Sequence, residues 1–124
     1  MRIAMPRGDI KLVRFLVNDR NGTATDVDFT EIYFTVKKSP KERLYEFQKR
    51  LSTGGITKLG LGDYQIKIEP KDTNKMFVNN TRFPNYVFDI QLDYKNFIKE
   101  TFVGTFVLTD EITYEENEGS EEDV

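Results

Sequence analysis

The chain has 124 residues, a formal net charge of −3 at pH 7, and no Cys, His or Trp. The missing Cys and His exclude disulfides, thiolate zinc sites, cysteine nucleophiles and the usual histidine base. An enzyme would have to rely on carboxylates, Lys, Tyr, Ser or Thr, as paired-carboxylate glycosidases do, so the composition disfavours catalysis.

The length suits one domain with its own core. Hydrophobic residues make up 38% of the chain and aromatic residues 13%, which is enough to fill the space between two sheets. No apolar run is long enough for a secretory signal or a transmembrane helix. We therefore expect the newly synthesised protein to be located in the cytoplasm.

Acidic residues are concentrated at the C-terminal end. Six of the 21 acidic residues lie in residues 115–124, and this stretch contains no basic residue. The rest of the chain holds 15 acidic and 18 basic residues, so it lacks the strongly basic character of a nucleic-acid binder. We predict a β-sandwich domain over residues 1–114 and a disordered acidic tail over residues 115–124.

In the first third of the chain, the hydrophobic pattern predicts two strands. Residues 10–17 are apolar with few interruptions, which predicts a central strand covered on both faces. Residues 31–37 alternate between apolar and polar side chains, as a strand with one buried face does. The residues predicted to face inward here are Ile32, Phe34 and Val36.

The next segment, residues 40–51, fits two structures. Residues 39–42 match a capping box with Pro40 at the first helical position. Apolar residues then follow at three- and four-residue spacings, at Leu44, Phe47 and Leu51. A strand would instead place Tyr45 and Phe47 on one face. The local signals slightly favour a helix.

Three further strands are predicted by alternation, at residues 63–69, 85–94 and 101–108. Their predicted inward residues are Tyr64, Ile66 and Ile68, then Tyr86, Phe88, Ile90 and Leu92, and finally Phe102, Phe106 and Leu108 with Gly104 on the same side. Asn-Gly and Gly-Gly pairs predict turns between strands. Pro70 ends one strand, and a single helical turn starting at Asp72-Thr73 is possible in the long connection that follows.

About seven short antiparallel strands separated by turns indicate an all-β fold, an immunoglobulin-like β-sandwich. A small closed barrel is the alternative architecture.

Two short motifs have a structural interpretation that we favour. Arg7-Gly8-Asp9 matches the adhesion tripeptide, but it lies where a first strand should turn into a second, with Gly8 easing the bend. Asn79-Asn80-Thr81 and Asn21-Gly22-Thr23 fit the glycosylation sequon, and without a signal peptide they indicate polar turns.

Several acidic residues are candidates for chemistry. Three acids could offer oxygens to calcium: Asp19, Asp26 and Asp28. Their spacing lacks the Gly and the terminal Glu of the calcium loop, which favours solvated loop acids. Two pairs could act as paired carboxylates: Glu69 with Asp72, and Asp89 with Asp93. Alternation places the second pair on a solvent face, which favours ordinary surface charge.

Most aromatic residues lie on predicted inward faces, and six are less well explained: Tyr33, Tyr45, Phe77, Phe83, Tyr94 and Phe97. One or two exposed rings would suit an interface or a sugar-binding surface. Gly60-Leu61-Gly62 lacks the Lys and the strand-to-helix setting of a phosphate-binding loop. The sequence thus identifies no catalytic, cofactor-binding or metal-binding residue, and it leaves the binding residues unknown.

The order of segments resembles an immunoglobulin-like domain of tailed phages and prophages of Firmicutes, similar to the N-terminal domain of upper baseplate proteins. The resemblance covers about residues 5–114. It rests on Arg7-Gly8-Asp9 and on residues 30–38, 47–49, 54–56, 64–73, 86–92, 101–108 and 110–113. It implies a strand at residues 45–49, and it carries over no catalytic residues.

The expected function is that of a non-enzymatic phage structural or assembly protein, in the head, tail or baseplate of the virion. It would be present in the host cytoplasm during assembly. Its partners would be other phage proteins or copies of itself, without nucleic acid, membrane or cofactor. The alternative is a carbohydrate- or cell-surface-binding module, which would need exposed rings beside polar groups in a groove. A carboxylate hydrolase is the least favoured alternative.

Overall fold

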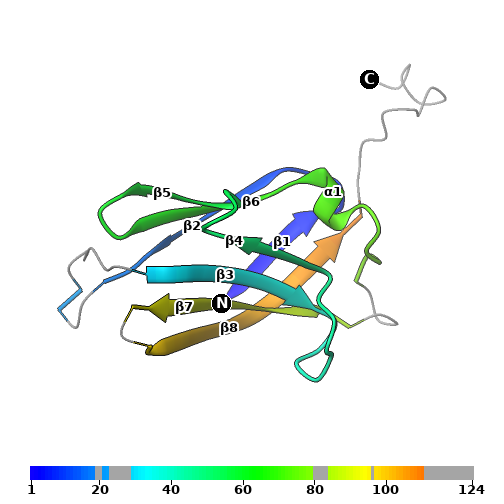
Figure 1. Cartoon of the computed structure of the whole chain (residues 1–124). Coiled ribbons are helices and arrows are strands. Elements are labelled where there is room, and N and C mark those ends of the chain that lie inside the picture. Colours follow the sequence, from blue (N-terminus) through cyan, green and yellow to red (C-terminus); the bar gives the residue numbers. More distant parts are fainter. Residues whose placement is uncertain (19–20, 23–28, 80–83, 96, 111–124) are drawn as a thin grey trace, which may run out of the picture.

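The computed structural model describes residues 1–18, 21–22, 29–79, 84–95 and 97–110. Within these residues, two β-sheets pack face to face, with one helical turn at a corner (Figure 1). The elements are β1 (Arg2–Pro6), β2 (Lys11–Leu16), β3 (Phe29–Lys37), β4 (Phe47–Arg50), β5 (Ile56–Gly60), β6 (Asp63–Ile68), α1 (Pro70–Thr73), β7 (Tyr86–Tyr94) and β8 (Lys99–Thr109). The predicted all-β sandwich is confirmed. The boundary predicted for the acidic tail lies outside the described residues.

The large sheet has the strand order β1-β8-β7-β3-β4, and the small sheet has the order β2-β6-β5. The ladders are antiparallel with one exception, because β1 runs parallel to β8 with Arg2 opposite Thr105. The described residues thus contain eight strands, against about seven antiparallel strands predicted.

The core is formed by the inward residues of both sheets, as alternation predicts. The predicted inward residues of β3, β6 and β7 are all buried, with exposed fractions of 5% or less. Aromatic rings connect neighbouring strands of the large sheet, with 5.4 Å between the ring centroids of Phe34 and Phe88 and 5.9 Å between those of Phe47 and Phe106. Tyr64 of the small sheet lies 5.8 Å from Phe29 of the large sheet.

The prediction of a central strand at residues 10–17 is wrong. In the structure β2 is an edge strand of the small sheet, paired only with β6. Val13, Phe15 and Val17 pack against the core, whereas the alternate residues face solvent. The exposed apolar residues of this segment are Ile10, Leu12 and Leu16. The apolar character of residues 10–17 therefore reflects an exposed hydrophobic face rather than a second buried one.

The segment 40–51 contains no helix. Residues 40–46 form turns and bends, and the strand β4 begins only at Phe47. The strand implied by the resemblance is therefore correct for Phe47–Lys49 but not for Tyr45. Burial of Phe47 and the ladder with β3 outweigh the local capping signals, as tertiary context commonly does.

The helical turn α1 begins at Pro70, two residues earlier than the predicted start. Glu69 and Asp72 form a capping box, in which each side chain accepts a hydrogen bond from the other residue's backbone N–H. The Glu69 N–H to Asp72 Oδ2 distance is 2.7 Å. Pro70 ends β6 as predicted, because proline cannot donate to the ladder.

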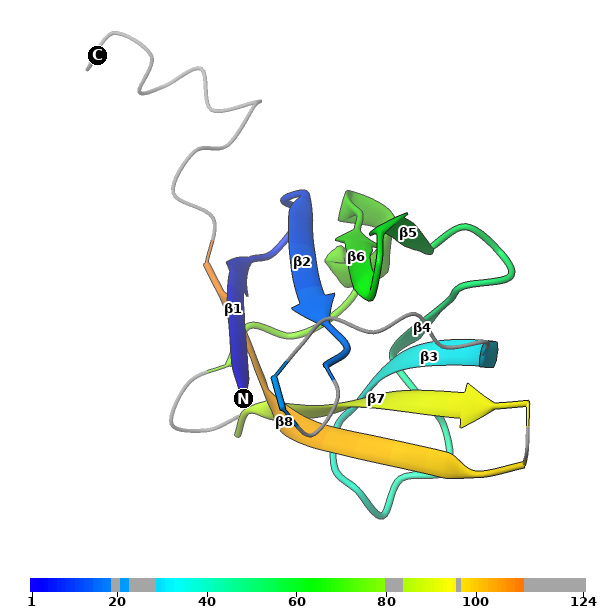
Figure 2. The ribbon, with the colours of Figure 1, turned by 90° about the vertical axis from the view of Figure 1, so that its left-hand side faces the viewer.

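The strand β8 bends where β1 begins, so that its second half runs beside β1 and its first half beside β7 (Figure 2). Gly104 lies at this bend. A Cβ atom on Gly104 would lie 2.5 Å from the Phe88 ring and 2.7 Å from the Met1 carbonyl oxygen, so only glycine fits. Beyond the bend Phe106 and Leu108 are buried, but Phe102 is 44% exposed, so its predicted place in the core is wrong.

We predict that Phe88→Ala lowers the free energy of unfolding by about 3–5 kcal/mol, because it removes a buried ring between Phe34 and Gly104. The matched control is Phe97→Ala, since Phe97 is 95% exposed and should change stability by less than roughly 0.5 kcal/mol. Urea unfolding of the three proteins checks this. Equal losses for both variants would contradict the assigned core.

Candidate interaction surfaces

The first half of β8 has an open edge. On that side β8 pairs with β1 only from Thr105 onward, and no described strand pairs with residues 99–103 there. Thr105 donates its N–H to the Met1 carbonyl oxygen at 3.1 Å, so its backbone polar groups point toward β1. Because these groups alternate along a strand, those of Lys99, Thr101 and Val103 point to the open edge.

An apolar hollow of about 320 Å³ lies beside this open edge. It separates the end of β2 from β7 and the first half of β8, and its lining is mostly hydrophobic. The apolar residues that line it include Met1, Phe15, Val17, Ile90, Leu92 and Phe102. Glu100 is the only charged side chain among the lining residues that the structure describes, and it accepts a short hydrogen bond from the Tyr94 hydroxyl. Desolvation, together with this hydrogen bond, raises the pKa of Tyr94 to about 12.

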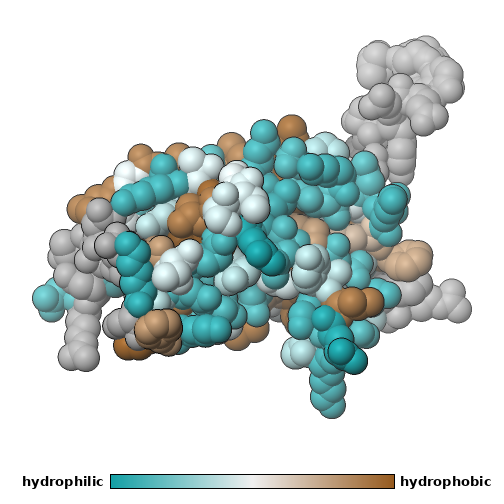
Figure 3. All heavy atoms as spheres, viewed as in Figure 1, coloured by the Kyte–Doolittle hydropathy of each residue, from teal (hydrophilic) through white to brown (hydrophobic). Residues whose placement is uncertain are grey.

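The small sheet carries exposed leucines, which we call the outer leucine patch: Leu12, Leu16, Leu59 and Leu61. Each of these side chains is about half exposed. Hydrophobic residues follow the upper rim of the molecule in Figure 3, where Figure 1 draws β2, β5 and β6. On the same sheet Arg14 forms an ion pair with Asp63, whose hydrogen bonds lower the pKa of the Asp63 carboxyl. Lys67, opposite Leu12 in the ladder, is exposed on the same face, so charged side chains interrupt the patch.

The outer face of the large sheet holds a shallow polar groove of about 270 Å³. It is lined by Tyr33, Thr35, Lys37, Arg43, Tyr45, Gln48, Asp89 and Gln91. Burial raises the pKa of Asp89, and the nearby Lys37 offsets part of this rise. Within the described part of the chain, Asp89 accepts no hydrogen bond. Tyr45 is half exposed and offers its ring at the groove.

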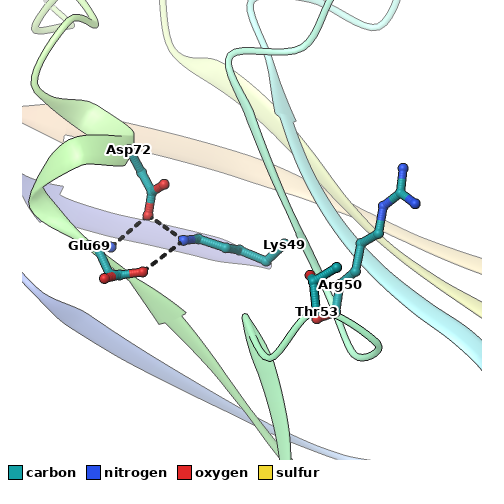
Figure 4. Close-up of polar contacts among 5 residues, drawn as sticks. All are labelled: Lys49, Arg50, Thr53, Glu69 and Asp72. Carbon is teal, nitrogen blue, oxygen red and sulfur yellow. Dashed lines mark hydrogen bonds and ion pairs between the residues drawn. The ribbon is translucent and has the colours of Figure 1, made fainter.

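A buried cation joins the large sheet to the corner at α1 (Figure 4). Lys49 is only 8% exposed, and its Nζ atom lies 2.7 Å from Asp72 Oδ2 and 3.4 Å from Glu69 Oε1. Hydrogen bonding and the charge of Lys49 lower the pKa of Glu69. The next residue, Arg50, points the opposite way and lies over the Tyr33 ring at 5.1 Å. Glu69 and Asp72 do meet, as a paired carboxylate requires, but they bind a lysine.

Arg7-Gly8-Asp9 forms the predicted turn, between β1 and β2. Gly8 has a φ of 85°, and its N–H donates to Thr73 Oγ1 at 2.8 Å. The Asn79 side chain accepts from the Leu108 N–H and donates to the Pro84 carbonyl oxygen, both at 2.8 Å. The Arg-Gly-Asp turn and Asn79 therefore connect segments that are distant in sequence.

The remaining sequence candidates are dispersed. Asp19, Asp26, Asp28 and Phe83 lie outside the described residues, as do parts of both sequons. Asp89 and Asp93 share the outer face of the large sheet, and Asp93 accepts a hydrogen bond from Gln91 at 2.8 Å. Gly60-Leu61-Gly62 forms the turn between β5 and β6. Of the six unexplained aromatic residues, Tyr33 and Tyr45 line the polar groove, Tyr94 lines the hollow, and Phe77 and Phe97 are exposed.

Sequence reasoning missed two features. The burial of Lys49 is indicated only by its position two residues after the inward Phe47. The open edge of β8 has no sequence signal, because alternation does not reveal where a neighbouring strand ends.

Within the described ranges, no group of three acidic residues could hold a metal ion, and no helix is long and apolar enough to cross a membrane. Comparisons of the chain with protein-family models, with curated proteins and with solved structures found no match.

We predict that Asp72→Ala lowers the free energy of unfolding by about 2–3 kcal/mol. It removes the closest counter-ion of a buried lysine, although Glu69 remains beside Nζ and reduces the usual loss of roughly 3–5 kcal/mol. Lys49→Met should lower the free energy of unfolding by less, because Asp72 then still caps α1. Urea unfolding of both variants measures the difference, and a larger loss for Lys49→Met would contradict this account.

Proposed function

We propose that this protein is a non-enzymatic structural or assembly component of a tailed phage or prophage, acting through protein–protein contacts. The observation that carries the proposal is the outer leucine patch. Leu12 and Leu16 are 55% and 58% exposed on β2, and Leu59 and Leu61 are 48% and 58% exposed on the neighbouring hairpin. Exposed apolar side chains gathered on one sheet commonly mark a contact with another macromolecule.

A rigid sheet favours this use of the patch. Phe15, Tyr64 and Ile66 hold the inner face of the small sheet against the core, so Leu12 and Leu16 on its outer face need no folding step before they bind. Each leucine buried at an interface would contribute roughly 1 kcal/mol or more. The pair Arg14–Asp63 would add specificity more than affinity.

The phage context has a separate support, the resemblance to immunoglobulin-like domains of Firmicutes phages. It rests on the order of segments, above all residues 64–73 and 86–92. A virion or assembly role also fits the expected presence of the protein in the host cytoplasm, where phage particles are built.

Quantitative mass spectrometry of phage particles, purified after induction of the host strain, tests the proposal. We expect the protein in a fixed ratio to a capsid or tail protein. A structural role would be refuted by absence from particles together with absence from assembly intermediates, despite expression in the lysate.

A second candidate is a carbohydrate-binding module, favoured by the polar groove on the outer face of the large sheet. Tyr45 offers a half-exposed ring, and Asp89 offers a half-buried carboxylate without a hydrogen-bond donor among the described residues. Stacked rings beside such acceptors bind sugars, whose faces are apolar and whose hydroxyls donate.

A glycan array tests this candidate. If the groove binds sugars, the wild type gives a reproducible signal, Tyr45→Ala and Asp89→Asn each lower it at least about tenfold, and the distant Phe77→Ala leaves it unchanged. No signal on the array would leave the protein–protein role as the better account.

A further inference from the structure

We infer that the open half of β8, residues 99–103, receives an extended segment of a partner protein as an added strand. The inference rests on the proposed protein–protein function and names the surface and the kind of partner. An added strand would continue the line of β1, which occupies the same edge from Thr105 onward.

No strand in the described part of the chain uses the outer backbone groups of this half-strand. The N–H and C=O groups of Lys99, Thr101 and Val103 point to the open edge, while the alternate residues pair with β7. The ladder with β7 extends from Asp93 opposite Lys99 to Tyr86 opposite Phe106, so these residues are already held in strand geometry. A partner strand would bind a preformed template, as in other cases of strand addition.

The hollow beside the edge provides the side-chain selectivity. Side chains on the inner face of an added strand would enter the space lined by Met1, Val17 and Phe102, which favours apolar residues. Glu100 is the only charged side chain among the described residues of the lining. A partner strand that places a basic residue beside Glu100 and an apolar residue two positions away would therefore be complementary. The expected partner segment is extended, alternating and basic–apolar.

Three of the four edge strands of the described sheets carry protective features. β1 carries Pro6, β4 places the charged Lys49 inward, and β5 has a register shift between Lys58 and Gly60. Proline, inward charges and bulges are the usual devices that prevent unwanted pairing of edges. The open half of β8 contains no proline and no bulge, and its β-branched Thr101 and Val103 favour pairing, whereas its inward Glu100 restricts which strand can pair there.

A second copy of the chain fits this edge poorly. If two copies paired β8 with β8 in antiparallel fashion, β1 of each copy would lie in line with the other copy's β8. Met1 and Arg2 of each copy would then meet the Phe97–Ile98 turn of the other. A segment without its own neighbouring strand avoids this clash, which favours a different partner over a second copy.

The experiment is NMR spectroscopy of the full chain labelled with ¹⁵N, titrated with a synthetic peptide, Ac-TKTVTIT-amide. On one face of the extended peptide, its second, fourth and sixth positions are basic, apolar and apolar. The control peptide, Ac-TETVTIT-amide, replaces the basic position with an acidic one. We expect chemical-shift changes and slowed amide exchange at Lys99, Thr101 and Val103, with several-fold weaker binding of the acidic peptide.

Two variants, one of them with a matched control, sharpen the test. Thr101→Pro removes one N–H that points to the open edge and leaves the bonds to β7, so it should weaken peptide binding roughly three- to tenfold. Thr101→Val keeps that N–H and should bind like the wild type. Glu100→Gln, which keeps a partner for Tyr94, should remove the preference for the basic peptide without abolishing binding.

The inference is overturned if neither peptide binds at about 1 mM, or if the shift changes map to the outer leucine patch instead. Slow exchange of the three amides in the free monomer would mean that the chain already covers this edge. Concentration-dependent protection without peptide would mean that a second copy does. Each of these two results also overturns it. If the protein is found in phage particles but binds no peptide, the proposed function stands and this inference fails. If it binds the peptide but is absent from particles and assembly intermediates, this inference stands and the proposed phage function fails.

Discussion

The inner face of a five-stranded sheet must be buried under a sheet of only three strands, and most features of the surface follow from this mismatch. The small sheet reaches the middle of the large one, where Tyr64 contacts Phe29 and Phe15 stacks on Tyr64. At one side this cover ends with β2. Among the described residues, the first half of β8 then has no neighbouring strand along its outer edge, and the apolar hollow lies between it and the end of β2. The exposure of Phe102 is a direct result.

At the opposite side of the large sheet, the same shortage of cover has a different outcome. β4 is four residues long, and its inward positions are Phe47 and Lys49. Phe47 joins the core, whereas Lys49 reaches the carboxylates of Glu69 and Asp72 at the corner of β6 and α1. Burying a lysine costs free energy that this geometry only offsets, so the cluster adds little net stability. Its effect is to fix α1 relative to β4 and to prevent another strand from pairing with the edge of β4. Gly55 permits it, because a Cβ atom there would lie 2.9 Å from the Lys49 side chain.

Sequence reasoning succeeded where a single periodicity determines the structure. On β7 every second residue from Tyr86 to Leu92 is apolar and buried, since both neighbouring strands hold it in one register. It failed where the environment depends on which strand is adjacent. Leu12 and Phe102 have the composition of core residues, but one lies on an outer face and the other beside an open edge. The capping signals before Phe47 were outweighed by long-range pairing with β3, which no local pattern contains.

The candidate surfaces differ in what they can discriminate. The polar groove offers separate donors and acceptors, some of which are already used. Gln48 donates to Thr35 within the groove, and Lys37 donates to the Glu42 carbonyl oxygen outside it. The outer leucine patch offers apolar area to bury, but few hydrogen-bonding groups that would fix the orientation of a partner. The open half of β8 combines both properties, because its backbone groups fix the direction and register of a partner while the hollow selects side chains. The assembly role that we propose would need that combination, which makes the strand edge the surface best suited to it.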